Sequence, residues 1–251
     1  MKIIALEEHF WTAGIRDANH EQMPAVFADR IPKLEDLGEQ RIKDMDRAGV
    51  DVQVISHTTP ATQTLPASKA IPLAKDANDQ LAAAIGKHPN RFAGFATLPT
   101  PDPDAAAQEL ERAIRVLHFK DAMINGRTGT RFLDDREYTP ILEAATSLDV
   151  PLYLHPTRPP EAVQNAYYAG FDPAVSFMLA NAGWGDLKAE LGTRETERLS
   201  IKYEPSIGSL LERRAESIAS PRVAVSDILS LSGGLQVCYF SRWRPIASSS
   251  R

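Results

Sequence analysis

The feature that most constrains this fold is a repeated alternation of short apolar runs with longer segments of helical periodicity. A strand–helix–strand order implies parallel strands joined by helical crossovers, because a parallel pair needs a long connection. The sequence therefore predicts an α/β fold built on a parallel sheet. The runs with the composition of buried strands are Ile3–Leu6, Val52–Ile55, Phe92–Leu98, Ala122–Ile124 and Pro151–Leu154.

The connecting segments carry start and stop signals for helices. Apolar residues recur at helical spacing over residues 73–85, and Gly86 predicts an end near that point. Asp102 is a typical N-cap, and Pro103 suits a first helical turn because the amide that it lacks has no partner there. Thr139-Pro140 repeats this start signal. We expect three helices from these signals.

Polar side chains follow the predicted strands at their carboxyl ends. They are Glu7, His9, His57, Asn125 and His155. Both an open sheet and a barrel satisfy the alternation, but active sites of α/β barrels are built at the carboxyl ends of the strands. The chain has 251 residues, close to the roughly 250 typical of that fold. We therefore predict a TIM-type (β/α)8 barrel, incomplete because only the first five strands are recognisable.

Three of these residues have the chemistry of metal ligands. The strand period of two predicts that Glu7 and His9 lie on one face, and His155 closes another strand directly before Pro156. A carboxylate and two imidazoles hold a catalytic zinc with one position open. The same donors are found in non-haem iron sites. The structural alternative is that all three are hydrogen-bonded at strand ends.

Composition excludes several classes of partner. The formal net charge is −5, so the chain lacks the basic surface that nucleic acid or an anionic membrane would attract. No apolar run approaches the roughly 20 residues of a membrane span, and the N-terminal pattern does not predict a signal peptide. The single cysteine, Cys238, is typical of a reducing compartment. These features predict a cytoplasmic protein.

The last quarter of the chain has a different character. Four serines lie in residues 1–185 and twelve in residues 186–251, and no histidine follows His155. We therefore predict a barrel portion over residues 1–185 and an atypical tail over residues 186–251. A frameshift or deletion in the gene near codon 186 is the simplest interpretation, and a genuine divergent segment is the alternative.

Several motifs follow one another along residues 1–185 in a recognisable order and spacing. They are Leu6-Glu-Glu-His-Phe10, Val52-Gln-Val-Ile-Ser-His-Thr-Thr-Pro60, Arg91-Phe-Ala-Gly-Phe-Ala-Thr-Leu-Pro99, Ala122-Met-Ile-Asn-Gly126, Phe132-Leu-Asp-Asp135, Val150-Pro-Leu-Tyr-Leu-His-Pro156 and Asn181-Ala-Gly-Trp-Gly185. Together they resemble a known enzyme group, the amidohydrolase-related aromatic-acid decarboxylases. This group contains the 2,3-dihydroxybenzoate and γ-resorcylate decarboxylases and is related to aminocarboxymuconate-semialdehyde decarboxylase.

The resemblance implies a metal-dependent barrel that is usually oligomeric and needs no organic cofactor. Zinc is the expected metal and manganese the alternative, with Glu7, His9 and His155 at the positions of the family's ligands. The family's later catalytic histidine is absent here. Its metal-binding aspartate cannot be placed, and Asp227 resembles it only superficially.

For substrate binding, the sequence offers three candidates beside the metal. The Asn125 amide can orient a hydroxyl or a carboxylate, His57 can line the pocket, and Phe10 can pack against an aromatic ring. Their structural alternatives are a satisfied loop histidine for His57 and a core side chain for Phe10. All three are predicted to face a small aromatic acid.

The resemblance implies a non-oxidative decarboxylase that releases CO2 from a hydroxylated aromatic carboxylic acid and forms a homo-oligomer. Metal-dependent hydrolysis of a lactone, ester or amide is the alternative within enzymes. An inactive remnant or binding protein is the alternative of another class, because an unfinished barrel leaves unpaired strand edges.

Overall fold

Five parallel strands form one sheet in the computed structural model, which describes residues 2–19, 29–157, 160–168 and 170–171. The strand order follows the chain order, so each connection joins two neighbouring strands. All five predicted strands are present, so this part of the sequence prediction is confirmed. The strands are β1 (Ile4–Phe10), β2 (Val52–His57), β3 (Phe92–Thr97), β4 (Asp121–Asn125) and β5 (Leu152–His155).

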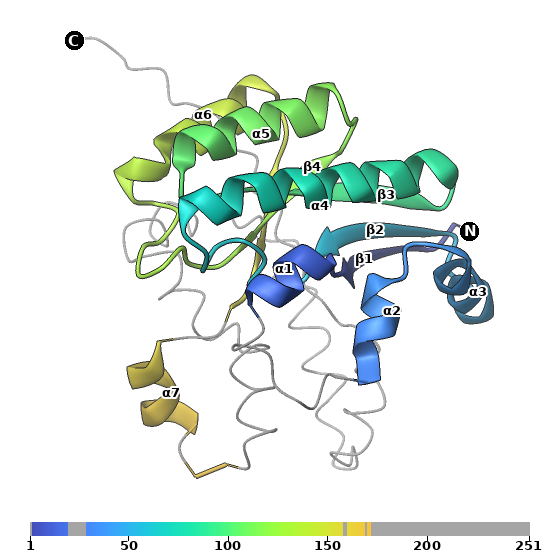
Figure 1. The fold of residues 1–251 in the computed structure, drawn as a ribbon, viewed down its shortest axis with the longest axis horizontal. Coiled ribbons are helices and arrows are strands. Elements are labelled where there is room, and N and C mark those ends of the chain that lie inside the picture. Colours follow the sequence, from blue (N-terminus) through green and yellow to red (C-terminus); the bar gives the residue numbers. More distant parts are fainter. Residues whose placement is uncertain (1, 20–28, 158–159, 169, 172–251) are drawn as a thin grey trace, which may run out of the picture.

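Helices follow the strands and cover one side of the sheet. Figure 1 shows α4, α5 and α6 side by side along that side, with α5 packed against both α4 and α6. The helices are α1 (Ala13–Ala18), α2 (Ile31–Glu35), α3 (Glu39–Ala48), α4 (Ala67–Lys87), α5 (Pro103–Arg115), the 3-10 helix η3 (Arg136–Tyr138), α6 (Thr139–Ser147) and α7 (Glu161–Tyr168).

The predicted helix signals act as expected. Asp102 caps α5, with its Oδ1 accepting a hydrogen bond of 3.0 Å from the backbone N–H of Ala105. Pro103 is the first residue of that helix. The helix over residues 73–85 is part of α4, which ends at Lys87, one residue beyond the expected point. α6 begins at Thr139, directly after a 3-10 turn.

The main hydrophobic core lies between the sheet and the helices. Leu81, Leu110 and Ile141 are fully buried there, one from each of the helices α4, α5 and α6. The sheet and helices approach closely at Gly94: a Cβ atom at this position would lie 2.9 Å from Ile85 Cδ1 and 3.0 Å from Leu81 Cδ2. A larger residue at this position would require the Ile85 and Leu81 side chains to shift. We call this region the outer layer.

The opposite face of the sheet has a smaller apolar cluster, formed by Val54, Phe95, Met123 and Tyr153. In a closed TIM barrel, this inner face is filled by layers of side chains from all the strands. Here the described strands supply part of such a layer. The prediction of an incomplete TIM-type barrel is confirmed, and we call the side chains of this face the inner layer.

Candidate metal centre

Two predicted ligands from opposite ends of the sheet meet on its inner side. The ring centroids of His9 and His155 are 5.1 Å apart, and the rings are nearly perpendicular, at 75°. His9 lies on β1 and His155 on β5, which are the first and last strands of the described sheet and are not paired with each other. The sheet must therefore curl strongly to bring the two imidazoles together.

The first strand is not regular at the predicted ligands. The pairing of β1 with β2 shifts between Ala5 and Glu8, and Glu7 has a left-handed φ of 58°. A strict period of two does not hold here, because Glu7 is the extra residue of a bulge. The inserted residue shifts the alternation by one beyond it, so that His9 pairs with Ser56 on the inner face.

The carboxylate of Glu7 nevertheless reaches the inner side of the sheet. One of its oxygens accepts a hydrogen bond from the hydroxyl of Tyr153, and the residue is only 6% exposed. Burial raises the pKa of Glu7, and the hydrogen bond from Tyr153 opposes that rise. A buried carboxylate with a single neutral donor is a group that a cation would stabilise.

In both histidines, the ring nitrogen Nδ1 contacts an oxygen atom of the protein. The Nδ1–H of His155 donates to the carbonyl of Pro156 at 2.6 Å, and His9 Nδ1 lies 3.2 Å from Ser56 Oγ. Burial lowers the pKa of His9 to about 3, with further lowering by His155, and lowers that of His155 to about 4. Neutral imidazoles held through Nδ1 present Nε2 as a metal donor.

The donor set fits a divalent transition metal. Two neutral imidazoles and one carboxylate, oriented by hydrogen bonds from the surrounding protein, are the ligands that zinc, manganese and iron accept. Among the residues that the structure describes, no three such side chains converge closely enough to form a complete cluster. A bound ion would therefore have to draw Glu7, His9 and His155 together.

His57 and Phe10 face the opposite side of the sheet from Ser56 and His9, because they are the next paired residues along β2 and β1. The backbone N–H of Thr12 donates to His57 Nε2 at 3.3 Å, and His57 Nδ1 donates to the carbonyl of Thr58 at 3.0 Å. Phe10 is fully buried in the outer layer, 5.1 Å from the His57 ring. Both ring nitrogens of His57 are thus occupied by backbone. Substrate binding by these residues stays a prediction, and their contacts favour a structural role.

Asn125 does lie beside His155. It pairs with His155 across β4 and β5, and it is 2% exposed. Its backbone N–H donates to the side chain of Gln63, whereas its own Oδ1 has no hydrogen-bond partner among the described residues. This oxygen keeps Asn125 a candidate for substrate binding.

Sequence reasoning missed three residues that support the site: Tyr153, Ser56 and Gln63. Tyr153 could have been noticed, because it lies two residues before His155 and strand alternation puts both side chains on one face. Nothing in the sequence marks the partner of Ser56 or Gln63. Asp227, the catalytic candidate named from the sequence, lies outside the described residues.

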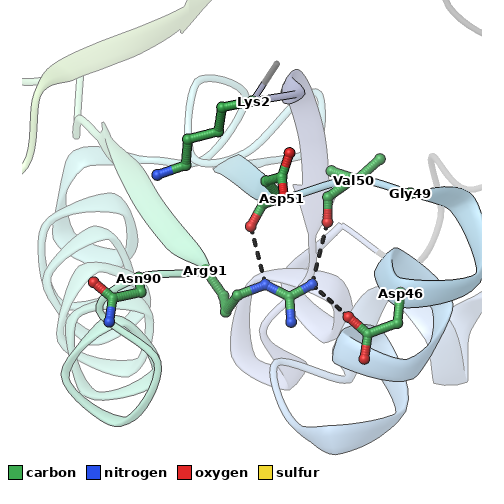
Figure 2. A pocket seen from close by; sticks show the side chains of 7 residues that line it. All are labelled: Lys2, Asp46, Gly49, Val50, Asp51, Asn90 and Arg91. Atoms are coloured by element: carbon green, nitrogen blue, oxygen red, sulfur yellow. Dashed lines mark hydrogen bonds and ion pairs between the residues drawn. The ribbon is translucent and has the colours of Figure 1, made fainter.

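A surface hollow lies at the other end of the strands, where β2 and β3 begin (Figure 2). It is lined by Lys2, Asp46, Gly49, Val50, Asp51, Asn90 and Arg91. The Arg91 guanidinium donates to the carbonyl of Asp51 at 2.9 Å, to Asp46 at 2.7 Å and to the carbonyl of Val50 at 3.1 Å. These bonds tie the segment before β2 to β3. The hollow is therefore separate from the histidine pair.

None of the helices in the described residues is long and apolar enough to cross a membrane.

A protein-family profile with the description Amidohydrolase matches residues 8–199. The chain belongs to this amidohydrolase family. The family resemblance predicted from the motifs is thereby confirmed. The match runs past Gly185, and the boundary between a barrel portion and a tail stays a prediction.

Several similar proteins of known name are decarboxylases. Decarboxylase orsB from Emericella nidulans is 35% identical over 190 residues, which are 73% of this chain and 55% of that protein. A γ-resorcylate decarboxylase from Rhodococcus jostii is 38% identical over 167 residues, covering 62% of this chain and 51% of that protein. The amidohydrolase chain thus spans about half the length of these curated relatives.

The solved structures agree with the fold. A dihydroxybenzoic acid decarboxylase from Polaromonas, crystallised with manganese and the inhibitor 2-nitroresorcinol, has a TM-score of 0.63 and 34% identity. The similarity covers 72% of this chain and 58% of that one. The manganese is bound in that structure.

Proposed function

We propose that this amidohydrolase chain acts as a metal-dependent, non-oxidative decarboxylase that releases CO2 from a hydroxylated aromatic carboxylic acid. The observation that carries the proposal is the meeting of His9 and His155, 5.1 Å apart, across the inner side of the sheet. Glu7 reaches the same side through the bulge in β1. The similarity to two named decarboxylases supports the choice of reaction.

Glu7, His9 and His155 would hold the metal in this proposal. When bound, a divalent ion supplies a Lewis acid that can chelate the substrate's carboxylate and ortho-hydroxyl and stabilise phenolate-like charge. The hydrogen bonds from His9 to Ser56 and from His155 to Pro156 keep both imidazoles oriented towards the interior.

Asn125 would orient the aromatic acid. Its unpartnered Oδ1 can accept a hydrogen bond from a phenolic hydroxyl beside the metal ligands. Decarboxylation also needs an acid that protonates the ring carbon bearing the carboxylate. Asp227 is the candidate for that step and stays a prediction, as do the homo-oligomer and the cytoplasmic location.

The decisive experiment measures metal and product together. The purified chain is titrated with Mn²⁺ and Zn²⁺, its metal content is determined, and CO2 release from 2,6-dihydroxybenzoate is followed. We expect about one ion per chain, as the three ligands of an open catalytic site imply. His155→Ala should lose the ion and His88→Ala should keep it, since His88 packs against Phe92 outside the site.

Each outcome separates the three functions that the sequence allows. Metal binding with CO2 release supports the decarboxylase. Metal binding with cleavage of a lactone or ester instead would identify a hydrolase. A soluble chain that binds no ion would contradict both and leave a non-catalytic remnant.

A further inference from the structure

A hydrogen bond between Tyr153 and Glu7 joins the two ends of the described sheet. The residues are 146 positions apart in sequence, and the bond links β5 to β1 across the inner side. Tyr153 also precedes His155 by two residues on the same strand, so both side chains face the interior. β5 thus carries one metal-ligand candidate, His155, and through Tyr153 it contacts a second candidate, Glu7.

The Tyr153 ring is held firmly in place. It is 1% exposed and packs in the inner layer with Val54, Phe95 and Met123. The Phe95 and Tyr153 ring centroids are 5.5 Å apart with an angle of 34° between the rings. Such packing leaves the phenol few alternative rotamers, and its hydroxyl therefore points in a fixed direction.

Glu7, in contrast, lies on irregular backbone. The residue is in the left-handed region, at φ 58°, and belongs to the bulge where the pairing of β1 with β2 shifts. A non-glycine residue in this region costs free energy and persists only where its surroundings hold it. The hydrogen bond from Tyr153 restrains its carboxylate.

We propose that Tyr153 is a positioning residue that fixes the Glu7 carboxylate, relative to His155, for binding of a divalent metal ion. The phenol O–H occupies one carboxylate oxygen and leaves the other for the ion, so Glu7 would bind through a single oxygen. The proposal rests on the proposed function, because it assigns Tyr153 a role at that same site.

The test compares Mn²⁺ affinity in matched variants of the full chain. Tyr153→Phe removes only the hydroxyl and keeps the ring, so the inner layer stays packed. We expect the Kd for Mn²⁺ to rise about 10–100-fold, as loss of a group that orients a metal ligand does elsewhere. Tyr138→Phe is the control, because Tyr138 is equally buried but lies in the outer layer.

A second pair of variants asks whether the effect passes through Glu7. Glu7→Asp keeps the charge but shortens the side chain by one methylene, which draws the carboxylate away from the phenol. In that background Tyr153→Phe should change the Kd by less than about twofold, because residues that act as one unit are not additive. If Tyr153→Phe acted only by loosening the packing of the inner layer, it would raise the Kd by the same factor in the wild-type and Glu7→Asp chains.

The outcomes for this inference and for the proposed function differ. If the wild-type chain and Tyr153→Phe bind Mn²⁺ equally well, the positioning role is wrong while the metal site stands. The positioning role is also wrong if Tyr153→Phe raises the Kd by the same factor in the Glu7→Asp chain as in the wild-type chain. If the wild-type chain binds no Mn²⁺, the metal site itself fails, and with it any ligand for Tyr153 to position.

Discussion

The two faces of the sheet differ in what they bury. The outer layer is mainly apolar, with Leu81, Leu110 and Ile141 fully buried between strands and helices, and its buried Asn78 amide is hydrogen-bonded to Glu109 at 2.7 Å. The inner layer has only a small apolar cluster, and it is bounded by polar side chains such as Asp121 at the start of β4 and Asn125 at its end.

Unsatisfied polar atoms show the cost of that difference. Within the described residues, Thr97 Oγ1, Asp121 Oδ2 and Asn125 Oδ1 are buried without a hydrogen-bond partner, and strand alternation with Phe95 and Met123 puts all three residues on the inner face. Each such atom costs about 1–3 kcal/mol. The outer layer therefore stabilises the fold, and the inner layer keeps polar groups where chemistry needs them.

The largest expected effect tests the outer layer. Leu81→Ala should lower the free energy of unfolding by about 2–5 kcal/mol, because it leaves a cavity against Gly94 and the α4–β3 contact. Urea denaturation measures this loss. The Kd for Mn²⁺ of the folded variant should stay at the wild-type value, and a weakened Kd would contradict the separation of the two layers.

The second prediction concerns Asp121 in the inner layer. A substitution there should stabilise the protein, which would contradict a simple division between a stabilising outer layer and a polar inner layer. Burial raises the pKa of Asp121 to about 8, against backbone hydrogen bonds from Ala122 and Tyr153 that lower it. Since this folded-state pKa lies above the unfolded value, the wild-type chain should lose stability as the pH rises through about 8.

Asp121→Asn removes this titration, because an amide resembles the protonated carboxyl. Between pH 5 and pH 8 the wild-type free energy of unfolding should fall by on the order of 3 kcal/mol more than that of the variant. Denaturation curves at both pH values give the difference. Parallel pH profiles for the two proteins would show that Asp121 is ionised in the folded state.

The smallest effect sharpens the comparison at the metal site. Ser56→Ala removes the hydroxyl 3.2 Å from His9 Nδ1. We expect the Kd for Mn²⁺ to rise about tenfold, at the lower end for such supporting contacts. The free energy of unfolding should change by less than about 1 kcal/mol, because one neutral hydrogen bond contributes little net stability. A stable variant with unchanged Kd would mean that Ser56 does not orient His9.

Much of the fold follows from local sequence signals. The strands, the Asp102 cap and the start of α6 were predicted from apolar runs and from cap and proline patterns. The end of the first strand was not, because apolar composition marks only Ile3–Leu6. The β1 ladder continues through Glu8–Phe10 by pairing with Ile55–His57, and such hydrogen bonds do not depend on apolar side chains.

The sequence by itself determined which residue types stand at the strand ends, and thereby the metal-ligand candidates Glu7, His9 and His155. Only the tertiary structure decided that a bulge turns His9 inward, that Tyr153 holds Glu7, and that backbone groups occupy His57. These outcomes depend on the curvature of the sheet and on partners distant along the chain. Strand periodicity carries information about neighbours two residues apart and none about residues that meet across a barrel.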